Sequence, residues 1–441
     1  MLKKSVSKNN KICVIGLWHL GCVVSACLSD AGYIVKGVDF DQEIIKNLRN
    51  KKAPLYEPGL DKLISKNIRK GTLSFTNSFK QSLAGSSFVF LTFDTPVDNR
   101  DRLDLSLLYK ACNEIAKFAP KKFTLVIISQ IPVGTSKKFK EYISSRNKNL
   151  SFEVVYNPEN LRLGQAIKCF MQPERIIIGL EKGITKRKIE DLYFFIKSPK
   201  IYMDLNSAEM VKHAINSYLA NSISFINEIA NLCEVLDVDV RKVVKGMKSD
   251  KRIGQYAFLN PGLGFAGGTL GRDLQVLRDF GEKTGSKTYL MDAVIKVNEN
   301  RKKILFKKIR NIFPFLKKIN IGILGLTYKA GTSTLRRSMA LDIAKQLIKN
   351  GANLKAFDPK VNTKIKEIKK LKILDNPYKI ADNSDLLILM TDWPEFKNLN
   401  FRRIRKIMRR PIIIDMRNFL EPEKLKKLSF NYYGVGIKYT K

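Results

Sequence analysis

The sequence predicts an α/β protein in which two doubly wound parallel sheets are joined by a helical middle region. Two segments, beginning at Lys11 and Ile319, each contain a short apolar strand, a turn with glycine, a helix and a second strand, which is the pattern of a βαβ unit. Between them, residues 207–236 contain neither Gly nor Pro and place apolar residues at helical spacing, so they predict one long helix. The 441 residues also exceed the roughly 250–300 that one hydrophobic core organises, so we expect several domains.

The first domain, a Rossmann-like sheet, is predicted over residues 1–203. Its opening βαβ unit has strands at 12–15 and 34–38, and the second strand leads directly into Asp39. Later apolar runs, separated by helical stretches, predict the other strands of a parallel sheet. These runs are residues 88–92, 124–128 and 153–156.

A helical domain and a second Rossmann-like sheet are predicted to follow. The long helix opens the middle domain, which we place at residues 204–303, and the last domain takes residues 304–441. The strands predicted in the last domain begin with a βαβ unit, whose second strand is stopped by a proline. They are residues 319–325, 353–358, 386–390 and 412–415.

The chain is strongly basic, with 80 Lys and Arg against 41 Asp and Glu and a net charge of +39. Such a charge attracts polyanions, so nucleic acid is the first partner to consider. The basic residues are, however, spread over almost every helix-like stretch and form no nucleic-acid-binding motif. We therefore expect a lysine-rich solvated surface and no nucleic-acid partner, although the same charge favours a phosphorylated small molecule.

The cysteines and the apolar segments indicate a cytoplasmic protein. The six cysteines form no Cys-x-x-Cys pair and mostly lie in apolar runs, so we expect reduced thiols and no metal site. No stretch has the ~20 apolar residues that a membrane span needs. The basic N-terminal segment leads directly into the first strand, so we expect neither a signal peptide nor membrane binding.

The turn after the first strand resembles a dinucleotide-binding fingerprint. In such a fingerprint the first glycine, here Gly16, makes the tight turn, and the third, here Gly21, lets the helix pack on the strand. The middle position, where glycine lets the backbone approach a pyrophosphate, is Trp18. Asp39 follows Gly16 by 23 residues, where its carboxylate can accept ribose hydroxyls and repel a 2′-phosphate, which favours NAD. The alternative is a sheet of the same kind that binds no dinucleotide.

Two polar residues of the long helix are candidates for catalysis. Lys212 and Asn216 are four residues apart and share one helix face. An ammonium and an amide placed in this way can hold an alkoxide or a developing oxyanion. The alternative is a solvated face, and His213, which lies off that face, is expected to pack or to be exposed.

A glycine-rich segment, residues 261–273, is the third candidate. So many glycines suggest a loop that passes close to a ligand, and Asp273 at its end could orient a lysine or a water molecule. The alternative is a flexible surface loop.

Together these segments resemble the UDP-glucose/GDP-mannose dehydrogenase family, and the resemblance extends from Lys11 to Asn418. The further markers, in chain order, are residues 54–60, Thr95-Pro96 before 104–106, 132–135, 157–162, 225–234, 252–254, 325–329, Arg336 with Ser338, and 415–418. One such motif would mean little, whereas the full ordered set is specific.

The resemblance implies an NAD-dependent enzyme that oxidises carbon 6 of a nucleotide sugar, with a UDP-sugar favoured. In this family the alcohol becomes a carboxylate in two hydride transfers, through a cysteine thiohemiacetal and thioester. Lys212 and Asn216 are implied to stabilise the oxyanion, Asp273 to position a water molecule, and Glu159 to act as a base in hydrolysis. Family members also form dimers through the long middle helix, so a homodimer is implied.

The resemblance also implies binding residues. For the cofactor site, it adds four residues to Gly16, Gly21 and Asp39, namely Trp18, Leu20, Thr95 and Gln130. The substrate site takes Gly264, Gly267, Lys329 and Arg417, and Arg252 is implied to reach the sugar nucleotide of a neighbouring subunit.

The sequence departs from the family pattern at four positions. Thr269 stands where the family has its nucleophilic cysteine, Gln130 replaces an active-site threonine, Leu163 a glutamate, and Trp18 the middle glycine. A threonine hydroxyl has too high a pKa to act as a thiolate does.

Three outcomes follow from these departures. The chain could complete the four-electron oxidation through the aldehyde hydrate, or stop after two electrons at an aldehyde or a ketone. It could also be a catalytically silent nucleotide-sugar-binding protein. A role in binding nucleic acid is the remaining alternative.

Overall fold

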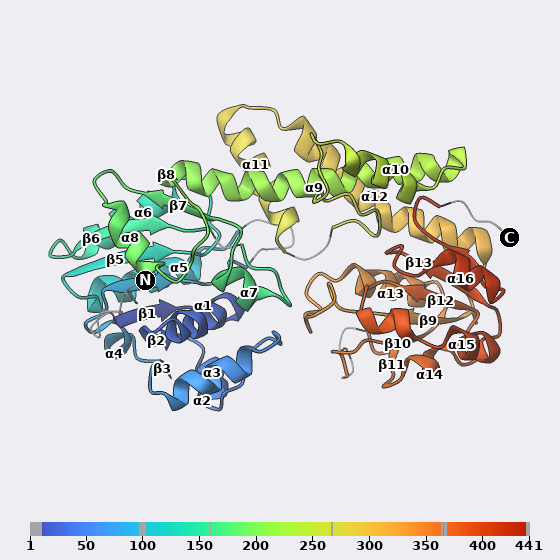
Figure 1. The fold of residues 1–441 in the computed structure, drawn as a ribbon, viewed down its shortest axis with the longest axis horizontal. Coiled ribbons are helices and arrows are strands. Elements are labelled where there is room, and N and C mark those ends of the chain that lie inside the picture. Colours follow the sequence, from blue (N-terminus) through green and yellow to red (C-terminus); the bar gives the residue numbers. More distant parts are fainter. Residues whose placement is uncertain are drawn as a thin grey trace. The chain divides into compact units, whose positions relative to one another are not determined.

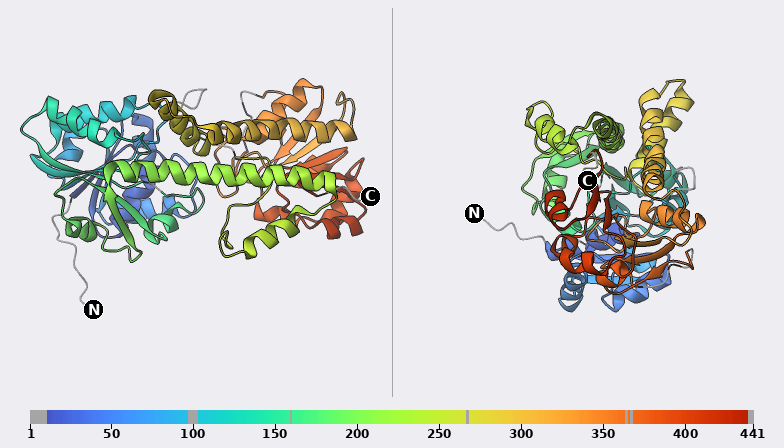
Figure 2. Two further views of the ribbon diagram at one scale, coloured as in Figure 1. Left: turned by 90° about the horizontal axis from the view of Figure 1, so that it is seen from above. Right: turned by 90° about the vertical axis from the view of Figure 1, so that its right-hand side faces the viewer.

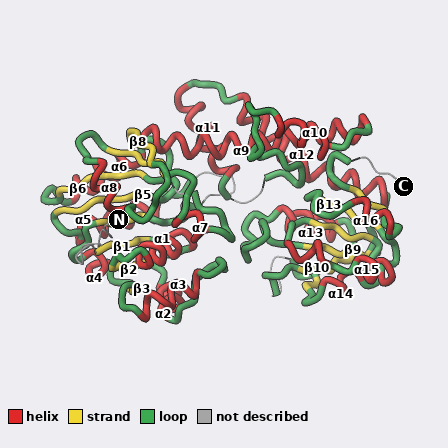
Figure 3. Tube along the Cα trace, viewed as in Figure 1, coloured by secondary structure: helices red, strands yellow, loops and turns green. Residues whose placement is uncertain are grey.

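The computed structural model describes residues 11–96, 103–158, 160–265, 268–362, 365 and 368–437. The chain divides into two compact units, Met1–Ala214 and Ile215–Lys441. Each contains one sheet with helices on both faces, and the two sheets are labelled in Figure 1 and coloured as strands in Figure 3. The predicted α/β class with two doubly wound sheets is therefore confirmed.

The first unit has an eight-stranded sheet in the order β3-β2-β1-β4-β5-β6-β7-β8. Its strands are β1 (Lys11–Ile15), β2 (Ile34–Val38), β3 (Leu73–Thr76), β4 (Phe88–Leu91), β5 (Lys122–Ile127), β6 (Ser151–Tyr156), β7 (Ile176–Leu180) and β8 (Lys200–Asp204). Neighbouring strands are parallel except β6 and β7, which are antiparallel. The sequence predicts a parallel sheet, whereas this sheet is mixed.

Alternate residues of β1 belong to two different cores, as a strand covered on both faces requires. Ile12 and Val14 pack in a core with α1, α2, α3, α7 and α8, whereas Cys13 and Ile15 pack in a core with α4, α5 and α6. The helices are α1 (His19–Asp30), α2 (Gln42–Arg49), α3 (Leu60–Arg69), α4 (Phe79–Leu83), α5 (Ser106–Phe118), α6 (Thr135–Arg146), α7 (Ala166–Met171) and α8 (Lys186–Leu192).

The second unit has a six-stranded sheet in the order β11-β10-β9-β12-β13-β14, with all neighbouring strands parallel. Its strands are β9 (Asn320–Leu324), β10 (Asn353–Phe357), β11 (Lys372–Ile373), β12 (Leu386–Leu389), β13 (Ile412–Asp415) and β14 (Asn431–Tyr433). Its helices are α10 (Val240–Ser249), α11 (Leu270–Thr284), α12 (Tyr289–Ile312), α13 (Met339–Lys349), α14 (Pro377–Ala381), the 3-10 helix η1 (Pro394–Asn398), α15 (Phe401–Ile407) and α16 (Pro422–Lys427).

The long helix predicted at residues 207–236 is α9 (Leu205–Leu236), a single helix that Figure 2 shows in light green. The boundary between the two units falls inside it. The sequence predicts two boundaries, near residues 203 and 303, whereas the structure divides once. The helical residues after 214 join the second sheet because Ile226 of α9, Leu305 of α12 and Ile323 of β9 share one hydrophobic core.

The six cysteines are free thiols, five of them buried and Cys169 half-buried, as the sequence predicts. Among the helices of the described residues, none combines the length and the apolar character that crossing a membrane requires.

Candidate active site

The turn after β1 needs its first and third glycines for steric reasons. Gly16 has a φ of 96°, and a Cβ there would come within 2.8 Å of the Phe93 side chain and backbone. A Cβ on Gly21 would overlap the carbonyl oxygen of Gly16. The two glycines therefore allow α1 to pack closely on the end of β1, which is the geometry of a dinucleotide-binding turn.

Trp18 does not strain this turn. It is the residue before α1 and has a φ of −72°, a conformation that any residue adopts, so its backbone does not require glycine. Its side chain is 41% exposed, whereas Leu20, on the first turn of α1, is buried. The departure from glycine at this position is therefore compatible with the fold of the turn.

Asp39 directs its carboxylate at the same turn. Its oxygens accept hydrogen bonds from Leu17 N at 2.5 Å and from Asp41 N at 3.0 Å. Burial raises the pKa of Asp39, and these backbone hydrogen bonds partly offset the rise. Because a carboxylate offers about four acceptor sites, two backbone donors leave capacity for ribose hydroxyls. The turn and Asp39 thus fit the adenosine and pyrophosphate parts of NAD.

The loops after β4 and β5 lie next to each other at the carboxyl edge of the sheet. Thr95 Oγ1 donates to the carbonyl of Gln130 at 3.1 Å, and both residues are buried. Ligands of doubly wound sheets bind at this edge. The structure therefore brings together two of the predicted cofactor residues.

The first turns of α9 fix the loop that follows Gln130. Glu209 accepts from the backbone N–H groups of Gly134 and Ser136, and His213 Nε2 lies 2.9 Å from the carbonyl of Ile131. Burial raises the pKa of Glu209, an effect that its hydrogen bonds oppose. No role for Glu209 is predicted from the sequence, because a contact across 75 residues leaves no spacing signal.

His19 and Glu57 form a second pair that sequence reasoning missed. His19 Nε2 lies 2.9 Å from Glu57 Oε2, and Glu57 also accepts from Gly164 N at 2.8 Å and Ala166 N at 2.9 Å. Both side chains are buried. The pair joins the glycine turn to the 54–60 segment, which gives that segment a structural role.

The polar residues of α9 are not a solvated face. Lys212 and Asn216 are each only 6% exposed, and they lie one turn apart on the helix. Asn216 Nδ2 donates a hydrogen bond to Oδ2 of Asp273, which is fully buried on α11. The structure thus brings together two of the predicted catalytic residues, Asn216 and Asp273.

Thr269 lies at the start of α11, one turn before Asp273. Asp273 N donates to the Thr269 carbonyl at 3.2 Å, and Thr269 itself is half-buried. The cysteines lie on β1, α1, α5, α7 and α9, so the α11 segment itself supplies no thiol. Glu159 and Gly267, predicted for hydrolysis and substrate binding, lie outside the described residues.

The remaining predicted substrate residues lie in the second unit. Gly264 has a φ of 98°, a conformation that favours glycine. Arg417 follows β13 and donates from Nε to the carbonyl of Met390 at 3.0 Å, and Lys329 is half-buried after β9. Arg252 is different, because its side chain is 89% exposed and pairs with Asp250 at 2.7 Å.

Asp358 accepts hydrogen bonds from the turn after β9, as Asp39 does from the turn after β1. Its Oδ2 accepts from Leu326 N at 2.7 Å and Thr327 N at 2.9 Å. The second sheet therefore repeats the strand-turn-helix geometry of the first, although it lacks the full glycine fingerprint.

Three domain families of the UDP-glucose/GDP-mannose dehydrogenases match the chain. The NAD binding domain matches residues 10–197, the central domain residues 206–300 and the UDP binding domain residues 322–422. Among curated proteins, a UDP-glucose 6-dehydrogenase of Rickettsia bellii is 36% identical over 434 residues, covering 97% of this chain and 99% of the relative. The UDP-glucose 6-dehydrogenase TuaD of Bacillus subtilis is 34% identical, covering 97% of this chain and 93% of the relative.

Solved structures give the same result. A UDP-glucose dehydrogenase from Pyrobaculum islandicum matches with a TM-score of 0.89 and 27% identity, covering 99% of each chain. A UDP-D-ManNAc dehydrogenase from Pyrococcus horikoshii matches with a TM-score of 0.85 and 27% identity, covering 97% of this chain and 99% of that one. The chain therefore belongs to the UDP-glucose/GDP-mannose dehydrogenase family and is an NAD-dependent nucleotide-sugar dehydrogenase.

Proposed function

We propose that this protein oxidises carbon 6 of UDP-glucose with NAD and stops at the aldehyde, after one hydride transfer. The observation on which this depends is the buried hydrogen bond between Asn216 and Asp273, one helical turn from Thr269 and on a segment without a thiol. The relatives named as UDP-glucose 6-dehydrogenases support UDP-glucose as the substrate.

NAD, when bound, accepts the hydride that leaves the alcohol carbon. The turn of Gly16 and Gly21 would hold its pyrophosphate, and Asp39 its adenosine ribose. The acidic residue at the end of β2 favours NAD over a cofactor with a 2′-phosphate.

Lys212 and Asn216 would stabilise the oxygen of the reacting alcohol. Loss of a hydride from carbon requires the hydroxyl to lose its proton, and the developing negative charge needs donors placed in advance. The Lys212 ammonium supplies one, and the amide of Asn216, oriented by Asp273, supplies another. One alcohol and one NAD⁺ then give one aldehyde, one NADH and one proton. The reaction needs no covalent intermediate.

The second oxidation needs an oxygen or sulfur nucleophile on the aldehyde carbon. A thiolate provides it readily, whereas the Thr269 hydroxyl is a poor nucleophile at neutral pH and its ester is less reactive than a thioester. Burial raises the pKa of five of the six thiols, which keeps them protonated: Cys13, Cys22, Cys27, Cys112 and Cys233. The aldehyde is therefore the expected product. The predicted role of Glu159, a base in hydrolysis, applies only to formation of the acid.

A panel of nucleotide sugars tests the substrate. We expect NADH formation with UDP-glucose and none with GDP-mannose, at equal concentrations with excess NAD. Lys212→Ala protein, which lacks the ammonium and is checked for folding by circular dichroism, is the control for contaminating dehydrogenases. Heat stabilisation by UDP-glucose and NAD without NADH would instead indicate a silent binding protein, and salt-sensitive DNA binding without any response to nucleotide sugars would indicate a nucleic-acid-binding role.

The proposal includes a homodimer formed through α9. Tyr218, Phe225 and Leu232 follow one another at seven-residue spacing and are 71%, 46% and 57% exposed. An exposed apolar stripe of this kind on a long helix is typical of an interface. Arg252, exposed on the same unit, would then be available to a second subunit. Light scattering tests this, since Phe225→Asp should convert a dimer into a monomer, whereas a wild-type monomer would contradict it.

A further inference from the structure

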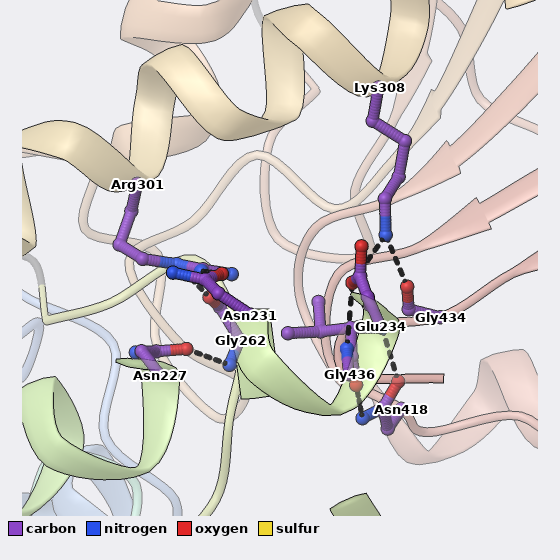
Figure 4. Close-up of polar contacts among 10 residues, drawn as sticks. Asn227, Asn231, Glu234, Gly262, Arg301, Lys308, Asn418, Gly434 and Gly436 are labelled. Atoms are coloured by element: carbon purple, nitrogen blue, oxygen red, sulfur yellow. Dashed lines mark hydrogen bonds and ion pairs between the residues drawn. The ribbon is translucent and has the colours of Figure 1, made fainter. Parts of the chain in front are cut away.

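The loop of residues 262–265 is held at its first residue by side chains from two helices. Gly262 N donates to Asn227 Oδ1 on α9 at 2.9 Å, and Arg301 Nε on α12 donates to the Gly262 carbonyl at 3.0 Å. Figure 4 shows that Asn227 and Arg301 contact Gly262 from two different helices, α9 and α12. Both backbone polar groups of Gly262 are therefore bound by side chains.

The last residue of the loop is held in the same way. Phe265 N donates to Asn298 Oδ1 at 2.8 Å, and Asn298 Nδ2 donates to the Phe265 carbonyl at 3.0 Å. Asn298 lies on α12, one turn before Arg301. Four hydrogen bonds from three side chains thus fix both ends of a four-residue loop.

Arg301 is costly to bury, which suggests more than a packing role. It is 2% exposed and occupies the same buried face of α12 as Leu305 and Ile309. Desolvation of a guanidinium is unfavourable, and burial lowers the pKa of Arg301 to about 10. If this position served only to pack the core, an apolar residue of similar size could fill it. Instead the guanidinium bonds to the loop and, through Nη1, to Asn231 Oδ1 at 2.7 Å.

The loop lies against the end of β13. A Cβ on Gly262 would come within 2.8 Å of the Met416 carbonyl and within 3.9 Å of Arg417 Cδ. The same loop continues in sequence to Thr269 and Asp273. The loop therefore lies next to Arg417, and along the sequence it leads to the start of α11.

A second set of contacts holds the segment that binds Asn418, the residue after Arg417. Lys308 of α12 pairs with Glu234 of α9 at 2.8 Å and donates to the Gly434 carbonyl at 2.6 Å, and Gly436 N donates to Glu234 at 2.8 Å (Figure 4). Between these glycines, Val435 exchanges two backbone hydrogen bonds with the side chain of Asn418, the residue after Arg417. The helices α9 and α12 thus hold the 262–265 loop next to Arg417 and the 434–436 segment next to Asn418.

We propose that Asn227, Asn298 and Arg301 are positioning residues that hold the 262–265 loop against Arg417 in the geometry that binds the nucleotide sugar. This inference rests on the proposed function, because it assumes that Arg417 and this loop contact the substrate. None of the three side chains needs to touch the substrate itself.

Asn298→Ala tests the proposal, with Asn300→Ala as the matched control. Asn300 lies two residues further along α12 and is exposed, so the control removes the same side chain from the same helix without touching the loop. In Asn298→Ala we expect the KM for UDP-glucose to rise at least tenfold and the KM for NAD to stay within twofold. Amide hydrogen exchange at Phe265 should accelerate at least tenfold. Asn300→Ala should match the wild type in all three.

Asn298→Asp separates positioning from general loss of structure. It keeps an acceptor for Phe265 N but replaces the donor to the Phe265 carbonyl with a carboxylate oxygen that repels this carbonyl, so its KM for UDP-glucose should rise while its KM for NAD stays within twofold. Unchanged Phe265 exchange in Asn298→Ala would overturn the proposal. A parallel rise in the KM for both UDP-glucose and NAD would also overturn it, because that result indicates general destabilisation.

Failure of the proposed function gives a different result. If the wild type forms no NADH with any nucleotide sugar, the affinity for UDP measured by calorimetry decides the matter. At least tenfold weaker UDP binding in Asn298→Ala than in Asn300→Ala would still support the positioning role. Equal UDP affinities would contradict it.

Discussion

Asn216 donates its side-chain amide to the buried carboxylate of Asp273, although 57 residues separate them in the sequence. The contact joins α9 to the first turn of α11, and it orients the amide that we expect to face the substrate oxygen. A buried carboxylate that lost this donor would be left poorly solvated, so the two residues depend on each other.

Asn216→Ala should lower kcat about 10²–10³-fold, the usual effect of removing one donor to a developing oxyanion. Asn206→Ala, an exposed asparagine on the same helix, is the control and should leave kcat unchanged. Steady-state kinetics at saturating UDP-glucose and NAD provide the measurement. Equal kcat values for the two variants would remove Asn216 from the mechanism.

Asp273→Asn should lower kcat about 10²–10⁴-fold if Asp273 takes part in proton transfer, because the amide cannot accept the proton. The fold should persist, since the substitution preserves the shape of the side chain. Circular dichroism establishes folding, and the rate of NADH formation establishes catalysis. Activity close to that of the wild type would show that Asp273 only orients its neighbour.

Gly21→Ala should destabilise the protein by about 1–3 kcal/mol and raise the KM for NAD, because a Cβ there overlaps the Gly16 carbonyl. Gly246→Ala should have the opposite effect on stability. Gly246 lies exposed within α10, and a Cβ added there would have no atom within 4 Å. That variant should gain about 0.5–1 kcal/mol. Urea unfolding compares the two, and a neutral effect of Gly21→Ala would contradict the packing described for this turn.

Iodoacetamide should not inactivate the native enzyme. Burial raises the pKa of Cys112 to about 12 and that of Cys13 further, so their thiolate fractions near neutral pH are very small. Cys169, which is half-buried, is the thiol expected to react first. Mass spectrometry of the alkylated protein, with activity measured in parallel, makes the comparison. Loss of activity in proportion to the modification of one thiol would point to a catalytic cysteine.

The strand and helix pattern was largely predictable, because apolar periodicity and glycine turns are local signals. The long helix α9 and the βαβ units at Lys11 and Ile319 followed from such signals. Strands β3, β7, β8, β11 and β14 did not. β3, β11 and β14 are short strands, and β7 pairs antiparallel with β6 against the parallel pattern of the sheet.

The site was predictable only in part. Glycines and the spacing of Lys212 and Asn216 show in the sequence because they act within one turn or one helix face. The roles of Glu209, His19 and Arg301 depend on partners 38 to 75 residues away, and only folding brings such partners together. The family resemblance supplied residue roles, but it does not reveal the side chains that hold the loops in place.

The number of NADH molecules formed per UDP-glucose consumed tests the central claim most directly. Product mass, measured in the same samples, distinguishes an aldehyde from a carboxylate. The wild type should give one NADH and the aldehyde, and Thr269→Cys, which supplies the missing thiol, should move the ratio towards two. Two NADH and a carboxylate from the wild-type enzyme would contradict the claim that Thr269 limits the reaction to a single hydride transfer.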